Sequence, residues 1–326
     1  MDKIRMRTNA GSINLRVTTK DGSPCEVWNG GKKIAEMQSD NWENIAVQNN
    51  AEEIIIKGYD IQELYCCGSK LTALDISGLT SLKELYCYNN QLTSLAVSGL
   101  TSLQWLDCSD NQLTALNASG CTSLQWLDCS DNQLTTLNVS GCTSLQELFC
   151  NNNQLTTLNV NGCTSLQWLD CYDNRLTALS VSGLTSLQHL DCSFNQHTAL
   201  DVSGLVNLED IDCCENGLTE LNVRNCRALQ RLNCSFNRLA ALDASGCTSL
   251  QKLYCNNNKL SAEVLKKLFE DFPERKEKCG RVLLYTDGDS KYKDFTQPPE
   301  LAAAFKAAKA KGWRLYKINN DDLMEL

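Results

Sequence analysis

The sequence predicts a parallel β-solenoid in which each 21-residue segment forms one coil and contributes one strand to a sheet. The segment TSLQWLDCSDNQLT occupies residues 101–114 and returns unchanged at 122–135. Around its cysteine, apolar and polar residues alternate, which is the period of a strand with one buried face. Ten cysteines follow one another every 21 residues without insertion or deletion, a regularity typical of solenoids. They are Cys66, Cys87, Cys108, Cys129, Cys150, Cys171, Cys192, Cys213, Cys234 and Cys255.

Each coil repeats the pattern LxxLxCxxNxL, as in Leu103, Leu106, Cys108, Asn111 and Leu113. We expect the leucines and the cysteine to face the core. We expect the asparagine to stack on its equivalents and to satisfy backbone groups that the turn leaves unpaired. The rest of the coil, LTALNASGC, is too short and too rich in Thr, Val and Gly for a helix, so extended or short 3₁₀ structure is predicted.

This pattern resembles the leucine-rich repeat, and most of all the bacterial 21-residue, cysteine-ladder type of internalin-like and gut-bacterial surface proteins. The resemblance covers about 200 residues. It implies a right-handed leucine-rich repeat solenoid, α/β by convention but β-rich. One long curved parallel sheet would form the concave face, with an extended or 3₁₀ convex side.

The two ends of the chain differ from the repeats. Short alternating runs separated by Gly- and Asn-rich turns predict an N-terminal β cap over residues 1–53. The solenoid of about ten repeats follows over 54–262. Residues 263–326 read as helix, strand, helix and strand, and predict a C-terminal α/β cap that resembles caps of gut-bacterial repeat proteins.

The cysteine ladder is interpreted as core packing. A thiol is a small apolar group that is often buried, whereas zinc sites need converging ligands in close pairs. A second, partial ladder supports this interpretation because leucine replaces cysteine in the same slot of other coils, as at Leu100 and Leu184. Cys67 and Cys214 follow ladder cysteines on the outward face and are the more reactive candidates. No metal site and no cofactor are predicted.

His197 occupies a slot that leucine fills in other coils. A buried or edge-exposed structural histidine is favoured there over a functional one.

The outward positions of the strands form columns that carry aromatic and acidic side chains. Residues 84–220 contain fifteen acidic residues and one basic residue, Arg175, whereas 221–259 contain six basic residues and one acidic residue. Stacked aspartates repel one another, so either solvent screens them or a basic partner or cation offsets their charge. The tryptophans are typical of binding hot spots, although they could instead stack on one another. The predicted partner-binding residues are Trp105, Asp107, Asp110, Trp126, Asp128, Asp131, Phe149, Trp168, Asp170, Tyr172, Asp173, His189, Asp191 and Asp212.

These features predict a non-enzymatic module that binds a basic protein or peptide through an acidic, Trp-rich concave face. The alternative is a carbohydrate-binding adhesin that uses the same aromatic residues. An enzyme is disfavoured because the chain has only two histidines and no phosphate loop. Nucleic acid is disfavoured because an acidic face repels phosphate.

A monomer is expected. No apolar run is long enough to cross a bilayer. The first residues contain no secretory signal, so the sequence as written predicts a cytoplasmic protein. A leader upstream would instead predict an exported or cell-surface protein, as the resembling family implies.

Overall fold

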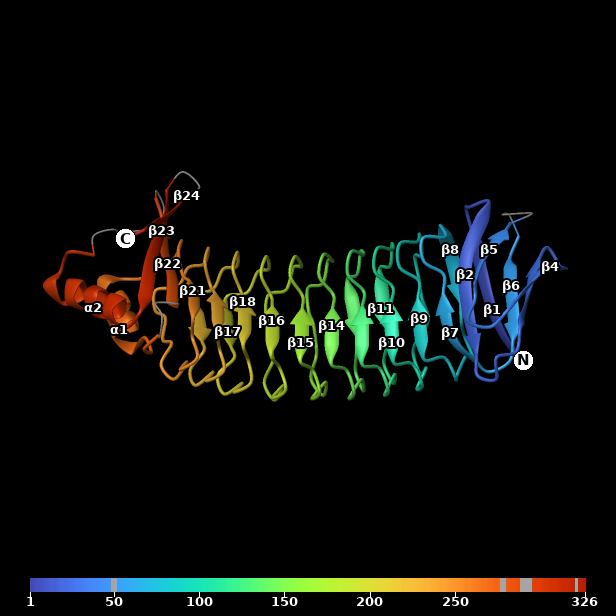
Figure 1. Ribbon diagram of the computed structural model, residues 1–326, viewed down its shortest axis with the longest axis horizontal. Helices are drawn as coiled ribbons and strands as arrows, with labels where there is room; N and C mark the ends of the chain where they lie inside the picture. Colours follow the sequence, from blue (N-terminus) through green and yellow to red (C-terminus); the bar gives the residue numbers. More distant parts are fainter. Residues whose placement is uncertain (48–51, 276–279, 288–294, 320–321) are drawn as a thin grey trace. The chain divides into compact units, whose positions relative to one another are not determined.

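In the computed structural model, residues 1–47, 52–275, 280–287, 295–319 and 322–326 are described. The chain divides into two compact units, Met1–Leu166 and Gln167–Leu326, and each is described by itself. In both units short strands from successive coils pair side by side in parallel (Figure 1).

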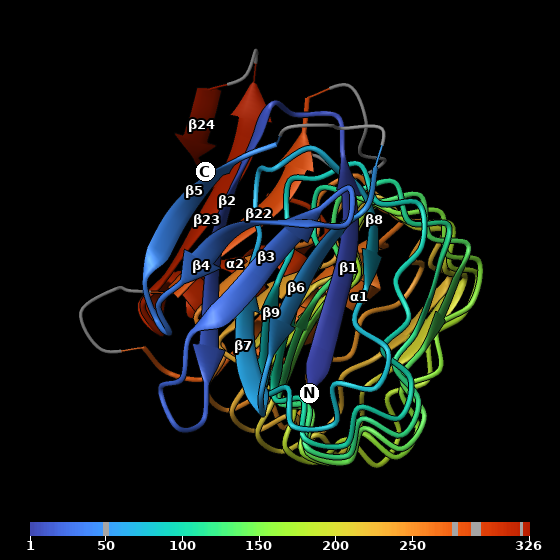
Figure 2. The same cartoon turned by 90° about the vertical axis from the view of Figure 1, so that its right-hand side faces the viewer.

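The first unit begins with an antiparallel sheet in the order β4-β3-β6-β1-β8, seen in blue in Figure 2. Alternating residues such as Ile4, Val27 and Ile56 form its core and are not exposed at all. The strands of this sheet are β1 Asp2–Thr8, β3 Cys25–Asn29, β4 Lys32–Met37, β6 Ile54–Gly58 and β8 Leu71–Asp75.

The second sheet of this unit has the order β5-β2-β7-β9-β10-β12-β14. Here β2 and β5 are antiparallel additions to the parallel strands of the repeats, so they cover the free edge that β7 would otherwise expose. The strands are β2 Ser12–Thr19, β5 Trp42–Ala46, β7 Ile61–Tyr65, β9 Glu84–Tyr86, β10 Trp105–Asp107, β12 Trp126–Asp128 and β14 Glu147–Phe149.

The second unit continues the same coil pattern and ends in an α/β segment. Its sheet has the order β15-β16-β18-β20-β21-β22-β23-β24, parallel except for β24. The strands are β15 Trp168–Asp170, β16 His189–Asp191, β18 Asp210–Asp212, β20 Arg231–Asn233, β21 Lys252–Tyr254, β22 Gly280–Thr286, β23 Trp313–Asn319 and β24 Asp322–Glu325.

The expected helices and strands of the C-terminal segment are present, and β24 is an addition that the sequence did not suggest. Helix α1, Ala262–Asp271, starts at Ser261, whose hydroxyl accepts the Val264 N–H at 3.3 Å, and ends before Pro273. Helix α2 spans Pro299–Ala310, and Trp313 stacks on Phe272 at 4.2 Å between ring centroids.

Within a coil, the strand occupies three residues and only its central side chain is fully buried. The return segments are extended, as predicted, and pair as β11 Ala115–Asn117 with β13 Thr136–Asn138 and as β17 Ala199–Asp201 with β19 Glu220–Asn222. Leu116 and Ala118 of the return segment are buried.

The asparagine ladder has the predicted structural role. The Asn111 Nδ2 donates to the carbonyls of Cys87, Cys108 and Ser109 at 3.0–3.2 Å, and its Oδ1 accepts the Leu92 N–H at 3.0 Å. One amide thus joins two successive coils, because it bonds to backbone groups of both.

The ladder cysteines are buried free thiols, as predicted, and burial raises the pKa values of Cys108, Cys129 and Cys192, for example. His197 is completely buried, and burial lowers its pKa to about 4. Neither of its ring nitrogens makes a hydrogen bond of normal geometry to a described residue.

Candidate functional site

The candidate site lies on the strand face, which we define as the outward side chains at the first and third positions of the three-residue strands. Strand register aligns these side chains in columns, as the 21-residue period predicts: Trp105 pairs with Trp126 and Asp107 with Asp128 in the first unit. In the second unit the aligned residues of the first column are Trp168, His189, Asp210, Arg231 and Lys252. Those of the third-position column are Asp170, Asp191, Asp212, Asn233 and Tyr254.

The aromatic residues of the face contact one another along the columns. Trp105 stacks on Trp126 at 6.4 Å and Trp126 meets Phe149 at 5.9 Å between centroids. Trp105 and Trp126 are therefore half-buried, in agreement with the stacking that the sequence offered as an alternative to ligand binding. Trp168 stacks on His189 at 4.1 Å but remains 39% exposed. Of the three tryptophans, Trp168 offers the most surface to a ligand.

The stacked aspartates are partly buried, and this changes their titration. Burial raises the pKa values of Asp107, Asp128 and Asp191, with further contributions from neighbouring carboxylates. Hydrogen bonds from a serine two residues later oppose the rise. The hydroxyl of Ser193, for example, donates to the Asp191 Oδ1 at 2.6 Å. The serines therefore stabilise part of the charge that the column concentrates.

A second group of acidic residues lies three positions after the end of a strand, and the local backbone conformation explains why these residues are acidic. Asp110, Asp131 and Asp173 are exposed and adopt φ angles of 50–51°, the left-handed region that Asp and Asn tolerate better than most residues. The turn conformation thus accounts for aspartate at these positions, and none of the three lines the pocket of the strand face.

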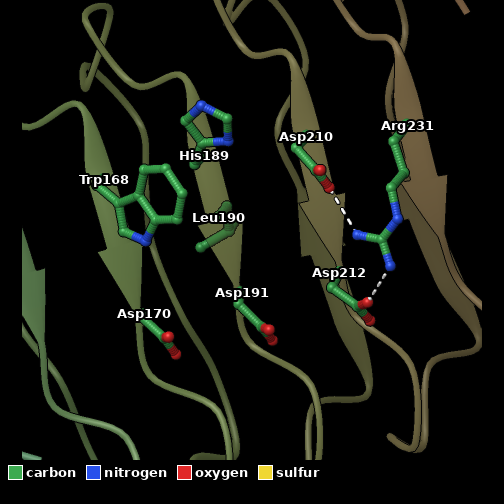
Figure 3. Close-up of a pocket in the computed structure, with 8 residues that line it drawn as sticks. All are labelled: Trp168, Asp170, His189, Leu190, Asp191, Asp210, Asp212 and Arg231. Atoms are coloured by element: carbon green, nitrogen blue, oxygen red, sulfur yellow. Dashed lines mark hydrogen bonds and ion pairs between the residues drawn. The ribbon is translucent and has the colours of Figure 1, made fainter.

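A pocket of about 150 Å³ opens on the strand face of the second unit (Figure 3). Trp168 and His189 lie on neighbouring strands, and Asp170 and Asp191 lie two residues further along the same strands. Opposite them, Arg231 donates to Asp210 Oδ1 at 2.8 Å and to Asp212 Oδ2 at 2.7 Å. Four carboxylates and one guanidinium therefore line the pocket, together with Leu190.

The structure brings five of the predicted site residues into this one pocket. They are Trp168, Asp170, His189, Asp191 and Asp212. Tyr172 lies in the turn after β15, where its N–H donates to Asp170 Oδ1 at 3.3 Å. Trp105, Asp107, Trp126, Asp128 and Phe149 belong to the strand face of the first unit.

Sequence reasoning left Asp210 and Arg231 out of the candidate site, although both line the pocket. A signal was present, because these residues of opposite charge are 21 residues apart and therefore adjacent in a column. The guanidinium stays charged. Burial disfavours its charged form, but the hydrogen bonds that it donates to Asp212 and Asp210 outweigh that effect and raise its pKa. A second pocket of about 180 Å³ adjoins the first, sharing His189, Asp210 and Arg231.

The two outward cysteines are poor nucleophiles in this structure. Burial, helped by Asp107, raises the pKa of Cys67 to about 11. Burial and a hydrogen bond with Asp212 raise the pKa of Cys214 to about 12. Since the thiolate is the reactive form, neither position has the electropositive setting of a reactive cysteine.

Among the described residues, no group of three or more His, Cys, Asp or Glu side chains is arranged to hold a metal ion. The helices in the described ranges are also too short or too polar to cross a membrane.

Comparisons with known proteins identify the repeat. A family model described as "Leucine Rich repeats (2 copies)" matches residues 122–162 and 227–267. None of the curated proteins compared with the chain matches it.

Several solved structures are similar. A leucine-rich repeat protein of Leptospira interrogans is 28% identical with a TM-score of 0.53, over 59% of this chain and 53% of the other. The functional domain of InlJ from Listeria monocytogenes, described as including a cysteine ladder, is 29% identical with a TM-score of 0.46, over 74% and 61%. The plant peptide hormone receptor RGFR1, solved in complex with RGF2, is 23% identical with a TM-score of 0.52, over 74% and 40%.

The match spans less than two thirds of each of these solved chains. The repeat pattern, the parallel strands and the family model agree with one another. The chain therefore carries leucine-rich repeats, and its coils form a leucine-rich repeat β-solenoid.

Proposed function

We propose that this protein is a non-enzymatic binding module that recognises a basic protein or peptide through its strand face. Leucine-rich repeats generally serve protein binding, and the side chains that line the pocket of the second unit indicate which chemical groups of a partner it would bind. The observation that carries the proposal is the combination of four carboxylates, one guanidinium and an exposed tryptophan in one pocket.

The charge of this pocket favours a cationic partner. Arg231 compensates only part of the negative charge of Asp170, Asp191, Asp210 and Asp212. Burial already disfavours the charged form of Asp191, so a bound cation lowers the free energy of that carboxylate. Complementary charge also steers a partner toward the face and excludes acidic partners.

The size of the pocket favours a side chain over a whole small molecule. Pockets for drug-sized ligands enclose roughly 300–1,000 Å³, whereas this one encloses about 150 Å³. A solved receptor with the same fold, RGFR1, is described as a complex with the peptide RGF2. A peptide that spreads several side chains over the columns is thus a suitable occupant for this fold.

The proposal is tested with a random peptide library screened against the purified protein at low and at moderate salt. We expect enrichment of Lys- and Arg-containing peptides, and weaker capture as salt rises. The variants Asp128→Lys and Asp191→Lys, one on each unit, should lower capture of the enriched peptides. Asp201→Lys changes the same charge on the return strand β17 and serves as the matched control.

Peptides without an excess of basic residues, or equal capture by all three variants, would contradict this function. A glycan array run in parallel tests the adhesin alternative. Specific binding of a neutral oligosaccharide that depends on Trp168, with no peptide capture, would replace the proposal.

A further inference from the structure

The pocket of the second unit combines two features that suit one functional group. Trp168 and His189 stack on each other, with ring planes inclined by 26° and centroids 4.1 Å apart, and together form an aromatic wall of the pocket. Asp170 and Asp191 lie two residues further along the same strands and project from the same face (Figure 3). Each strand thus presents an aromatic ring and a carboxylate at positions i and i+2.

The chain uses the same pairing, in the reverse order along the strand, to hold an arginine of its own in the first unit. On β7, Glu63 and Tyr65 occupy positions i and i+2. The Arg16 guanidinium lies over the Tyr65 ring at 3.9 Å from the centroid, and its Nη2 is 3.5 Å from the Glu63 Oε2. Asp40, whose Oδ1 is 3.5 Å from the Arg16 Nη1, and the Trp42 ring at 5.9 Å complete this arginine's surroundings. A ring and a carboxylate two residues apart on one strand therefore take part in holding a guanidinium on this type of face.

The second unit holds an arginine in a related way beside the pocket itself. The Arg231 guanidinium spans Asp210 and Asp212, again positions i and i+2 of one strand, at 2.8 and 2.7 Å. It also lies 5.6 Å from the centroid of the Tyr254 ring in the next coil. The spacing of side chains two residues apart thus matches the two-pronged donor geometry of a guanidinium.

We propose that the pocket formed by Trp168, Asp170, His189 and Asp191 is a subsite for the guanidinium of an arginine in the bound partner. The guanidinium would lie against the Trp168–His189 wall and donate to the two carboxylates. This inference rests on the proposed function and narrows it, because it distinguishes arginine from lysine.

Physical chemistry favours arginine at such a site. A guanidinium is planar and weakly hydrated, stacks on aromatic rings and donates in parallel to carboxylates. A lysine ammonium is compact and strongly hydrated, so it satisfies the carboxylates but gains less from the aromatic wall. The resident Arg231 pairs with Asp210 and Asp212, so the guanidinium of the partner would meet Asp170 and Asp191 on the opposite side of the pocket.

The test compares two probes of equal charge, hexa-arginine and hexa-lysine peptides, by isothermal titration calorimetry with the full chain. We expect the arginine peptide to bind at least about threefold more tightly, the factor that one stacked guanidinium supplies. Trp168→Leu should remove the preference and leave both peptides bound equally, because charge attraction remains. Since Trp168 is 39% exposed, this change spares the core.

Asp191→Asn should weaken the binding of the arginine peptide several-fold. The variant keeps the Oδ1 acceptor for the Ser193 hydroxyl, so the local turn stays intact. Asp201→Asn, which removes the same charge from the return strand, is the matched control and should leave binding unchanged. Circular dichroism of each variant verifies folding.

The outcomes separate this inference from the proposed function. Equal affinity of the wild-type chain for both peptides, or a preference for arginine that survives Trp168→Leu, overturns the subsite while a basic partner still binds. Failure of both peptides to bind overturns the basic-partner proposal together with the subsite.

Discussion

At the turn position three residues after each strand, the backbone has a positive φ angle, and some of the residues found there suit this conformation better than others. Most coils place Asn, Asp or Gly there, and these adopt φ angles of 50–61°. Two coils of the second unit place phenylalanine there: Phe194 and Phe236 have φ angles of 50° and 53° and are 54% and 42% exposed. A bulky residue is disfavoured in this region, so both positions store backbone strain.

We predict that Phe194→Asn stabilises the protein by on the order of 1 kcal/mol, because asparagine tolerates the left-handed region and an exposed ring is removed. Thermal and urea unfolding of the variant measure the gain. The reverse change at an equivalent exposed turn position, Asn89→Phe, should lower stability by a similar amount. Equal stability of Phe194→Asn and the wild type would show that the turn carries no strain.

For individual residues of the strand face, the sequence predicted which side chains are aligned in columns but not how exposed each side chain is. A period of 21 residues places Trp105 beside Trp126, since in-register strands repeat every coil. Whether neighbouring rings cover one another depends on side-chain rotamers, which the period does not specify. For this reason Trp105 and Trp126 proved half-buried while Trp168 stayed exposed.

At the scale of the coil, the asparagine ladder joins successive coils through buried hydrogen bonds. Each amide satisfies carbonyls of its own coil and of the preceding one, and it accepts an N–H from the preceding coil. Its function could be predicted from sequence because an invariant spacing within one chain brings the same groups together in every coil.

We predict that Asn111→Ala destabilises the first unit by at least about 2 kcal/mol, since it leaves several buried backbone groups without partners. Urea unfolding monitored by circular dichroism measures the loss. The adjacent Gln112 is exposed, so Gln112→Ala should change stability by less than about 0.5 kcal/mol. A similar effect of the two changes would refute the structural role of the ladder.

Other features of the elements could not be read from their own residues. The alternating pattern of β2 predicts a strand but not its neighbour, and the structure pairs it antiparallel to β7 at the edge of the repeat sheet. The short segment that forms β24 has no comparable pattern and gains its partner only from β23. Strand pairing between distant segments depends on which edges the rest of the fold leaves open.

At the scale of the whole molecule, buried titratable groups set how stability depends on pH. Burial lowers the pKa of His197 to about 4, so the folded protein keeps this ring neutral where the unfolded chain protonates it. The contribution of His197 to the free energy of unfolding therefore falls as pH decreases from 6.5, the ordinary pKa of histidine, toward 4. Asp107, Asp128 and Asp191 act in the opposite sense, because their folded pKa values are raised.

We predict that His197→Leu, which restores the residue type of other coils, stabilises the protein and that this gain increases as pH falls from 7 to 4. The increase should reach on the order of 3 kcal/mol, because the pKa of His197 is 6.5 in the unfolded chain and about 4 in the folded protein. Urea unfolding at a series of pH values measures it against the exposed control Gln196→Leu, which should show no such increase. A gain independent of pH would contradict a buried neutral histidine.

The sequence by itself determined the repeat, the buried ladders and the order of side chains along the strand face. A constant 21-residue period makes each residue the neighbour of its equivalent, whatever the rest of the chain does. Only the tertiary structure decided which charges are compensated and where a pocket opens on the strand face. Arg231 pairs with Asp210 and Asp212, and Trp168 remains exposed beside Asp170 and Asp191, because these outcomes depend on rotamers and burial rather than on sequence spacing.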